Sequence, residues 1–280
     1  LSDSPTSCQI ASLSSDGRGV GKVEDKSVFV SGALPGETVE FLYTAKRRDY
    51  DEGILHKVIS ASADRVEPQC QYFGACGGCV LQHYSVDKQI AFKLDQLKNN
   101  LTRIGKVDVS EYVAPITGKI WGYRHKARLG CRHVHKKGKV LVGFRERQSS
   151  FIMEMDRCEV LHPSVGSRID GLARLIAQLS VYDKVAQIEV AVADNGCGLV
   201  FRNLEAFTED DIEALIQFAK DNELVIYQQP GGLDSIELIY PDHYIPTYTA
   251  AAFDIRFEFS PTDFTQVNPS VNTQMLELAI

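Results

Sequence analysis

Three cysteines within ten residues constrain the fold of this chain more than any other feature of its sequence. Cys70, Cys76 and Cys79 form a C-x5-C-x2-C cluster, and glycines at 74, 77 and 78 separate them. Three thiolates on one tight loop suit a soft metal ion or an iron–sulfur cluster. Such a site needs a fourth ligand. Cys158 is the best candidate because it follows a basic, strand-like stretch that returns the chain toward the loop.

Other interpretations of the cysteines remain open at this stage. Cys131 and His162 are rival fourth ligands, and a structural zinc site is an alternative to a cluster, although zinc sites usually pair two short knuckles. Three buried cysteines without any ligand are the third possibility. Cys8 and Cys197 lie in strand-like patterns and are expected to be small core residues.

The composition is that of a globular protein in a reducing compartment. Seven cysteines, an odd number, with no secretory signal pattern predict a cytoplasmic location. No apolar run approaches the roughly 18–20 residues of a membrane helix, so we expect no membrane association. The first residue is Leu1, and we expect that the natural N-terminus has been removed.

Residues 8–60 predict a small closed β-barrel. Five short alternating stretches follow one another without any helical periodicity, and turn sequences such as Leu34-Pro-Gly-Glu37 separate them. Gly17, Gly19 and Gly21 do not match a phosphate-binding loop, since no helix follows them. We expect them to be turn positions with positive φ.

The remainder predicts an α+β domain, mostly antiparallel. Ser85 is placed to cap a helix that ends at Gly105, with an apolar stripe of Ile90, Leu94, Leu97, Leu101 and Ile104. Apolar spacing predicts a helix after Pro163, Thr208 is placed to cap another, and Asp194-Asn-Gly196 marks a hairpin. The chain is expected to be strand-like from Tyr123 through residues 140–144 and 151–155, and the other expected strands are residues 186–192, 198–201, 225–228, 235–240 and 253–259.

Charge is segregated along the chain, whose formal net charge is −7. Residues 119–147 contain ten Lys or Arg against one Glu, whereas the chain from Asp183 onward has seventeen acidic residues against four basic ones. A basic segment within an acidic chain indicates a localised anion site, and nucleic acid is its commonest partner. A solvated basic hairpin with no ligand is the alternative.

Four ordered motifs resemble the bacterial RNA uracil-C5 methyltransferases. Residues 70–82 resemble that family's C-x-x-F-G-x-C-G-G-C-x-x-Q signature, and residues 121–129 its W-x-Y-R-x-K/R-x-R stretch. Val142–Arg145 and Asp156–Cys158 resemble the strands that follow, and residues 260–268 resemble the F-x-Q-V-N start of the methyltransferase domain. The barrel is similar to a TRAM domain, an oligonucleotide-binding fold. Barrel and cysteines together resemble the branch that acts on 23S rRNA.

The resemblance implies a fold and a domain division. The fold class is mixed β and α+β: residues 1–62 form an OB-like TRAM barrel, residues 63–255 a central α+β iron–sulfur domain, and residues 256–280 the start of an α/β methyltransferase domain. The helix over residues 85–104 is expected to pack on the catalytic domain of such enzymes.

The resemblance also implies roles for individual residues. Cys70, Cys76, Cys79 and Cys158 match the ligands of a [4Fe-4S] cluster, and Gln266 matches a residue that contacts S-adenosylmethionine. Phe264 matches an aromatic near the flipped base. Without the resemblance, Phe264 would be interpreted as a core residue and Gln266 as a helix cap. The expected RNA contacts are Arg124, Lys126, Arg128 and Arg132 on one strand and Lys46, Arg47 and Arg48 on the barrel, whose Phe29, Phe41 and Tyr43 are expected to stack on bases.

Family chemistry implies what else the reaction needs. A Cys thiolate adds to C6 of uracil, C5 then takes the methyl group from S-adenosylmethionine, and a base removes the C5 proton. No Gly-rich donor loop follows Asn268 and no Cys follows Cys197. We therefore expect a truncated chain that recognises 23S rRNA but is inactive alone and has no catalytic residue of its own. The alternatives are a complete iron–sulfur RNA-binding module and a zinc-stabilised protein without a nucleic-acid role.

Overall fold

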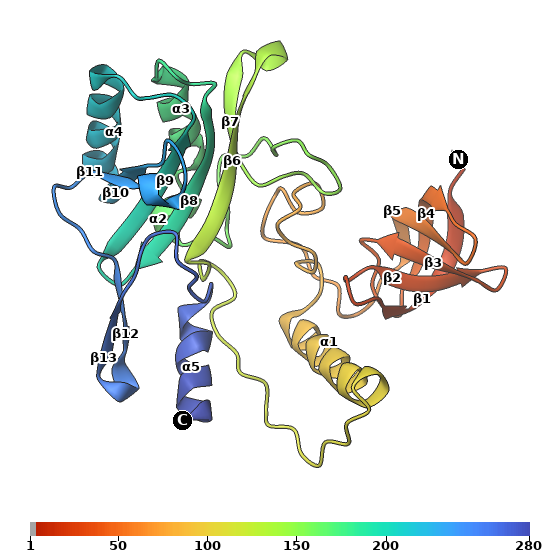
Figure 1. Ribbon diagram of the computed structural model, residues 1–280. Coiled ribbons are helices and arrows are strands. Elements are labelled where there is room, and N and C mark those ends of the chain that lie inside the picture. Colours follow the sequence, from red (N-terminus) through yellow and green to blue (C-terminus); the bar gives the residue numbers. More distant parts are fainter. Residues whose placement is uncertain (1–3) are drawn as a thin grey trace. The chain divides into compact units, whose positions relative to one another are not determined.

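The computed structural model of the protein describes residues 4–280 and divides into two compact units (Figure 1). The first unit comprises the chain up to Gly74 together with Cys79–Pro115. The second comprises Ala75–Gly78 and Ile116–Ile280, so the middle of the cysteine loop belongs with the second unit. Within the described residues, no helix has the length and apolar character needed to cross a membrane.

Five strands of the first unit close into a barrel, as the sequence predicts. Their order around the barrel is β1-β2-β3-β5-β4, and β4 pairs back onto β1. The β3–β5 pair is parallel and the other pairs are antiparallel. The strands are β1 (Thr6–Leu13), β2 (Gly19–Val23), β3 (Lys26–Ser31), β4 (Thr38–Lys46) and β5 (Tyr50–Ser60).

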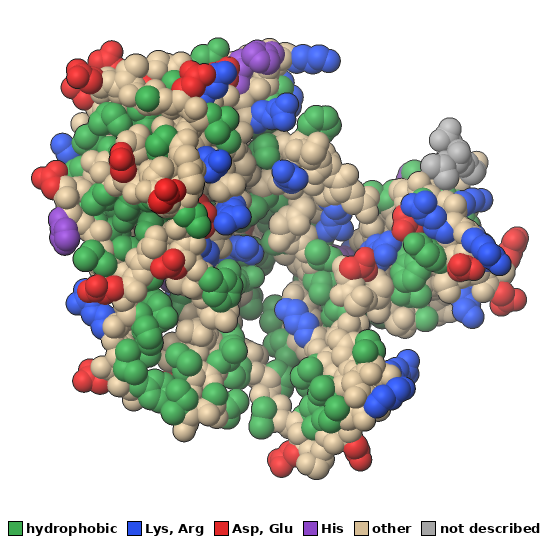
Figure 2. All heavy atoms as spheres, in the orientation of Figure 1, with side chains coloured by type: hydrophobic (Ala, Val, Ile, Leu, Met, Phe, Trp, Pro, Cys, Tyr) green, Lys and Arg blue, Asp and Glu red, His purple; other side chains and the backbone are tan. Residues whose placement is uncertain are grey.

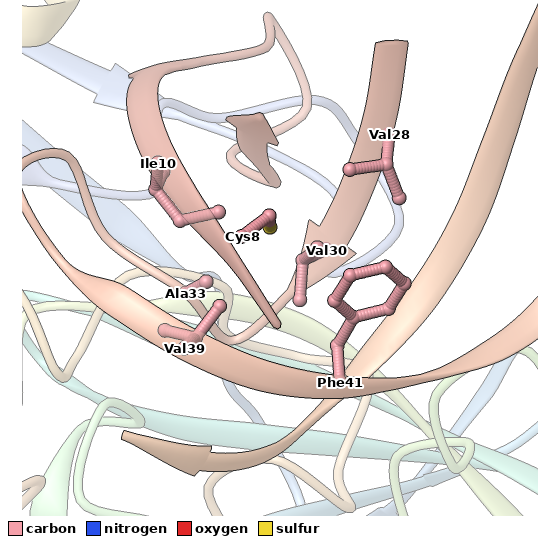
Figure 3. Packing of buried hydrophobic residues seen from close by; sticks show 7 residues of the cluster. All are labelled: Cys8, Ile10, Val28, Val30, Ala33, Val39 and Phe41. Atoms are coloured by element: carbon pink, nitrogen blue, oxygen red, sulfur yellow. The ribbon is translucent and has the colours of Figure 1, made fainter. Parts of the chain in front are cut away.

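Seven side chains fill the barrel (Figure 3). Six of them come from alternate strand positions, because successive side chains of a strand point to opposite faces; they are Cys8, Ile10, Val28, Val30, Val39 and Phe41, and Ala33 joins them from the connection between β3 and β4. Phe41 is fully buried and has no surface on which a base could stack. The expectation that Phe41 contacts RNA is therefore wrong: the alternation that places Val39 in the core places Phe41 there too.

The glycines near residue 20 have different roles from those the sequence suggested. Gly17 lies in a turn with φ of +82°, as expected. Gly19 and Gly21 instead lie within β2, and neither has positive φ. A Cβ at Gly21 would lie 2.7 Å from the Gln9 carbonyl oxygen, and one at Gly19 would lie 2.9 Å from that of Ala33. Close backbone approach inside a small barrel, not turn geometry, explains these two glycines.

A buried ion pair fastens the chain that leaves the barrel. Glu37 is fully buried, and its carboxylate accepts bonds from Arg65 Nε at 2.6 Å and from the Leu34 amide at 2.8 Å. Burial opposes ionisation of this group, but the hydrogen bonds from Arg65 and Leu34 outweigh it and keep the pKa of Glu37 below its ordinary value. Arg65 also donates to the Gly32 carbonyl, so the link after β5 is held against the barrel.

The helix predicted after Ser85 is present, and its apolar stripe is half-buried to exposed. It comprises α1 (Val86–Asn99) and a π-helical turn (Asn100–Ile104) that ends at Gly105. No residue of α1 is buried, and Leu97 and Ile104 are 50% and 79% exposed. Ser85 occupies the N-cap position, although its side chain makes no capping hydrogen bond.

A six-stranded sheet forms the centre of the second unit, in the order β11-β10-β9-β8-β6-β7. All neighbours are antiparallel except β9 and β10, which confirms the mostly antiparallel α+β expectation. The strands are β6 (Lys126–Val134), β7 (Lys139–Gly143), β8 (Val185–Ala193), β9 (Gly196–Asn203), β10 (Leu224–Gln228) and β11 (Glu237–Tyr240).

Helices cover one face of this sheet (Figure 1). They are α2 (Pro163–Gly166), α3 (Ile169–Gln178) and α4 (Glu209–Asn222), and α4 begins with the expected cap at Thr208, a capping box completed by Asp211. The apolar residues that predicted the helix after Pro163 are all buried, namely Val165, Ile169, Leu172, Leu175, Ile176 and Leu179. The pattern therefore identified both the helices and their buried face.

The remaining elements include one correction. A hairpin of β12 (Thr247–Ala250) and β13 (Ile255–Glu258) precedes α5 (Pro269–Ala279), and short 3-10 turns lie at His135–Lys137, Leu233–Ser235 and Ala251–Phe253. The strand expected over residues 151–155 is not formed. Only Ile152 makes an isolated bridge, to Arg145, and Met155 is buried against Gly143.

The Glu37–Arg65 pair yields a stability prediction. Replacing Glu37 with Gln leaves the guanidinium without its counter-charge, and a broken buried pair costs about 3–5 kcal/mol. Arg65 is partly exposed, so we expect a loss of about 2–3 kcal/mol in the free energy of unfolding, measured by urea denaturation. Glu40→Gln on β4 is the matched control. Equal effects of the two substitutions would contradict the assigned role.

Candidate nucleic-acid interface

Strand β6 carries the predicted RNA contacts, and its alternation divides them from the core. Ala127, Leu129 and Cys131 are buried, whereas Arg128 and Arg132 are exposed on the opposite face. Burial raises the pKa of the Cys131 thiol and keeps it protonated, so this rival fourth ligand is poorly suited to bind metal as a thiolate.

A buried carboxylate on β8 orders the basic side chains of β6. Glu189 is 5% exposed and lies 3.0 Å from Lys126 Nζ and 3.3 Å from Arg128 Nε. Lys126 also donates to the Pro261 carbonyl, and Arg124 Nε donates to the Lys126 carbonyl at 3.0 Å. Arg124 and Lys126 are thus bound within the protein, whereas Arg128 and Arg132 keep exposed guanidinium groups.

A hollow of about 710 Å³ opens beside these arginines. Arg128, Arg132 and Arg145 line it together with His135, and Asp183 is the one acidic residue among its described lining. Figure 2 shows Lys and Arg side chains over the β6–β7 side of this unit and acidic side chains mostly over the α4 side. Such a concentration of positive charge is what a phosphate backbone requires. Arg145 was absent from the predicted contacts, although its G-F-R motif was visible in the sequence.

The barrel presents a second set of basic and aromatic groups. Lys46, Arg47 and Arg48 are exposed between β4 and β5, and Lys46 lies over the Tyr43 ring at 4.3 Å. On the same barrel, Arg18 lies 4.9 Å from the Phe29 ring centroid, and Phe29 contacts Tyr50 edge to face at 5.4 Å. Phe29 and Tyr43 are half-buried and Tyr50 is exposed, and aromatic rings with adjacent cations are typical of surfaces that bind single strands.

The structure distributes the four predicted cluster ligands over both units. Cys70 and Cys79 belong to the first unit, and Cys76 and Cys158 to the second. None of the seven cysteines, all in the described part of the chain, forms a disulfide. Among residues 4–280, no group of three or more His, Cys, Asp or Glu side chains is placed to hold a metal ion. The iron–sulfur cluster is therefore not shown, and its ligand set stays a prediction.

The rival ligand His162 has another role. It occupies the N-cap of α2, where its Nδ1 accepts from the Ser164 amide and lies 2.8 Å from Ser164 Oγ. Its ring meets that of His125 edge to face at 4.8 Å, and both line a hollow of about 400 Å³ with Trp121. Burial lowers the pKa of His125 to about 4, and the positive charges of His162 and Lys119 act in the same direction.

The segment before α5 presents Phe264 and Gln266 to solvent. Phe264 is 83% exposed, so it is not a core residue, and Gln266 is also exposed. Asn268, not Gln266, caps α5: its side chain accepts from the Val271 amide at 3.3 Å. The His125 amide donates to the Val267 carbonyl at 3.0 Å, which ties this segment to the basic stretch before β6.

A closed barrel and a basic sheet surface are features typical of nucleic-acid-binding proteins. Residues 9–50 match the family described as TRAM domain. Over 275 residues the chain is 46% identical to the "23S rRNA (uracil(1939)-C(5))-methyltransferase RlmD" of Methylococcus capsulatus, covering 98% of this chain and 62% of that protein. The protein of that name from Nitrosococcus oceani is 46% identical over 277 residues, with coverage of 99% and 62%.

A solved structure shares the fold. The Pyrococcus abyssi tRNA (uracil-54, C5)-methyltransferase, in complex with S-adenosyl-L-homocysteine, aligns with 97% of this chain and 64% of its own length at a TM-score of 0.65 and 20% identity. The chain is similar over almost its whole length to these curated relatives and spans 62% of their length. The similarity to these enzymes gives no support to the expectations that the chain is truncated, inactive alone or without catalytic residues.

The His125–His162 contact yields a pH prediction. The unfolded chain binds a proton at His125 near pH 6.5 and the folded chain near pH 4, so the stabilising effect of neutral His125 is full above pH 6.5 and falls as pH drops toward 4. Between pH 7 and 5 the loss is about 2 kcal/mol. We expect His125→Gln to flatten this part of the urea-unfolding profile and His56→Gln, an exposed control on β5, to leave it unchanged. Parallel profiles for both variants would contradict the assignment.

Proposed function

We propose that this protein is an S-adenosylmethionine-dependent methyltransferase that forms 5-methyluridine in 23S rRNA, and that the described residues recognise the RNA. The observation that carries the proposal is the basic hollow of β6, in a chain 46% identical to enzymes named for this reaction. Arg128 and Arg132 would bind phosphates there. Lys46, Arg47 and Arg48 would bind them on the barrel.

The target uracil must leave its stack before a methyl group can reach C5, which costs a few kcal/mol. Contacts on both sides of the target can supply that energy, because each neutralised phosphate releases counterions. The exposed ring of Phe264 is available to stack on a splayed base, and Gln266 on the same segment is proposed to contact S-adenosylmethionine. The uracil chemistry needs a thiolate that adds to C6 and a base that removes the C5 proton.

We propose further that Cys70, Cys76, Cys79 and Cys158 hold a [4Fe-4S] cluster. The support is the donor set, in which three thiols share one loop and the Gly78 amide donates to Cys76 Sγ at 3.4 Å, the kind of bond that tunes cluster sulfurs. Such a group would connect the loop to the segment before α2. The proposed reaction transfers no electron, so its contribution would be structural.

Methyl transfer is the direct test of the function. The protein expressed from its own gene should transfer the labelled methyl group of S-adenosylmethionine to C5 of uridine in unmodified 23S rRNA, detected as 5-methyluridine after nuclease digestion. Transfer to another base, or none above a blank in protein that binds the RNA, would contradict the proposal. Arg132→Ala should raise KM for RNA with little change in kcat, because the contact forms before the chemical step.

The cluster has its own test. Protein purified without oxygen should contain about four iron and four sulfide per chain and absorb broadly near 400 nm, as four thiolates on a cubane require. Cys158→Ser should lower the iron content, whereas Cys131→Ser, at the buried rival position, should not. One zinc per chain and no sulfide would contradict the cluster.

A further inference from the structure

The arginines that line the hollow differ in whether an acidic side chain of the protein pairs with them. Arg128 is paired with Glu189, whereas Arg132 and Arg145 form no ion pair within the described part of the chain. Both are exposed. Arg145 lies just beyond the end of β7, outside the regular sheet, so something other than the β6–β7 ladder must hold it.

The cysteine loop supplies that support on one side of Arg145. The Gly77 amide donates to the Arg145 carbonyl at 2.9 Å, and the Arg147 amide donates to the Ala75 carbonyl at 2.8 Å. Cys76 and Glu146 face each other between these bonds as an antiparallel bridge. Residues 75–77 therefore act as a short strand paired with residues 145–147, within the second unit.

The chain after the loop supports the other side. The Glu146 amide donates to the Phe151 carbonyl at 2.9 Å, the Met153 amide donates to the Phe144 carbonyl at 2.8 Å, and Arg145 bridges to Ile152. Arg145 thus lies on the middle one of three paired segments, between residues 75–77 and residues 151–153. The alternation of a strand leaves its side chain in the hollow while its backbone is fixed on both edges.

We propose that Arg145 binds a phosphodiester of single-stranded RNA in the hollow and that the loop of residues 75–78 is the element that positions it. The inference rests on the proposed function. An exposed arginine loses rotamer and backbone freedom on binding, and a backbone already fixed by two hydrogen bonds lowers that cost. The cysteine loop thereby contributes to RNA affinity through the placement of one guanidinium group, independently of what its thiols bind.

Two neighbouring glycines offer a matched pair of variants. A Cβ at Gly77 would lie 3.0 Å from the Arg145 carbonyl oxygen and 3.3 Å from that of Glu146, so Ala there must push the Arg145 segment away. A Cβ at Gly78 would lie 3.5 Å from Cys76 Sγ and 3.6 Å from the Phe144 ring, which is ordinary contact. Neither glycine has positive φ, so both tolerate Ala in their backbone conformation.

The experiment measures binding of a single-stranded 23S rRNA fragment to the chain over a range of salt concentrations. We expect Arg145→Ala to weaken binding about tenfold and to lower the slope of log K against log salt by about 0.7, the value for one phosphate contact on a single strand. Gly77→Ala should weaken binding in the same direction, and Gly78→Ala, whose Cβ makes only ordinary contacts, should weaken it much less. Arg145→Lys should recover the salt slope because it keeps the positive charge. It should recover only part of the affinity, because lysine cannot make the paired hydrogen bonds of a guanidinium group.

The double variant decides whether the loop acts through Arg145. In the Gly77→Ala, Arg145→Ala chain the two effects should not add, since the positioned group is already gone. Full additivity, or an unchanged salt slope in Arg145→Ala, would overturn the proposal while leaving the proposed function intact. Failure of the unchanged chain to bind the RNA would instead remove the proposed RNA recognition.

If Gly77→Ala destabilises the protein and so lowers its urea midpoint, hydrogen exchange on the unsubstituted chain provides a second test. Hydrogen exchange of the Gly77 and Arg147 amides, which close the two bonds between the segments, should slow further when the RNA fragment binds. If RNA leaves the exchange rates of both amides unchanged, binding does not stabilise the pairing of residues 75–77 with residues 145–147. That result would overturn the positioning role.

Discussion

Glu189 is the buried charge on which the basic surface of the second unit depends. A carboxylate in the middle of a sheet is costly unless cations neutralise it, and Lys126 and Arg128 from the neighbouring strand do so. Lys126 then reaches the Pro261 carbonyl, so one buried acid fixes both the strand β6 and the segment that carries Phe264. This interaction thus links Arg128 on β6 to the segment that carries the exposed ring of Phe264.

Periodicity accounts for the parts of the fold that the sequence predicts well. The barrel, the helices of residues 163–178 and 209–222 and the hairpin at Asn195 each rest on local alternation, spacing or a cap, which neighbouring residues determine. The glycines of β2 were misassigned because their requirement comes from Gln9 and Ala33 on other segments. Likewise, residues 151–155 alternate as a strand does, but the packing of Met155 against Gly143 takes precedence.

The site was predictable as a region and not as a set of contacts. The charge count located the basic segment, yet it could not separate Lys126, whose side chain is 13% exposed, from Arg128, which is 70% exposed. That distinction depends on Glu189, 61 residues from Arg128 along the chain. Arg145 was missed for a similar reason, because only the pairing of residues 75–77 with residues 145–147 makes it part of the hollow.

The separation of charge within the second unit has a consequence for recognition. The first turn of α4 carries Glu209, Asp210 and Asp211, and the chain as a whole has a net charge of −7, so most of its surface repels RNA. Attraction is expected at the hollow lined by arginines of β6 and by Arg145, and at Lys46, Arg47 and Arg48 on the barrel. Repulsion elsewhere disfavours nonspecific encounters and orients the polyanion during approach, whereas a uniformly basic protein would bind RNA in many registers. An acidic protein with a few localised basic surfaces would therefore limit the phosphate backbone to a few paths before any base is read.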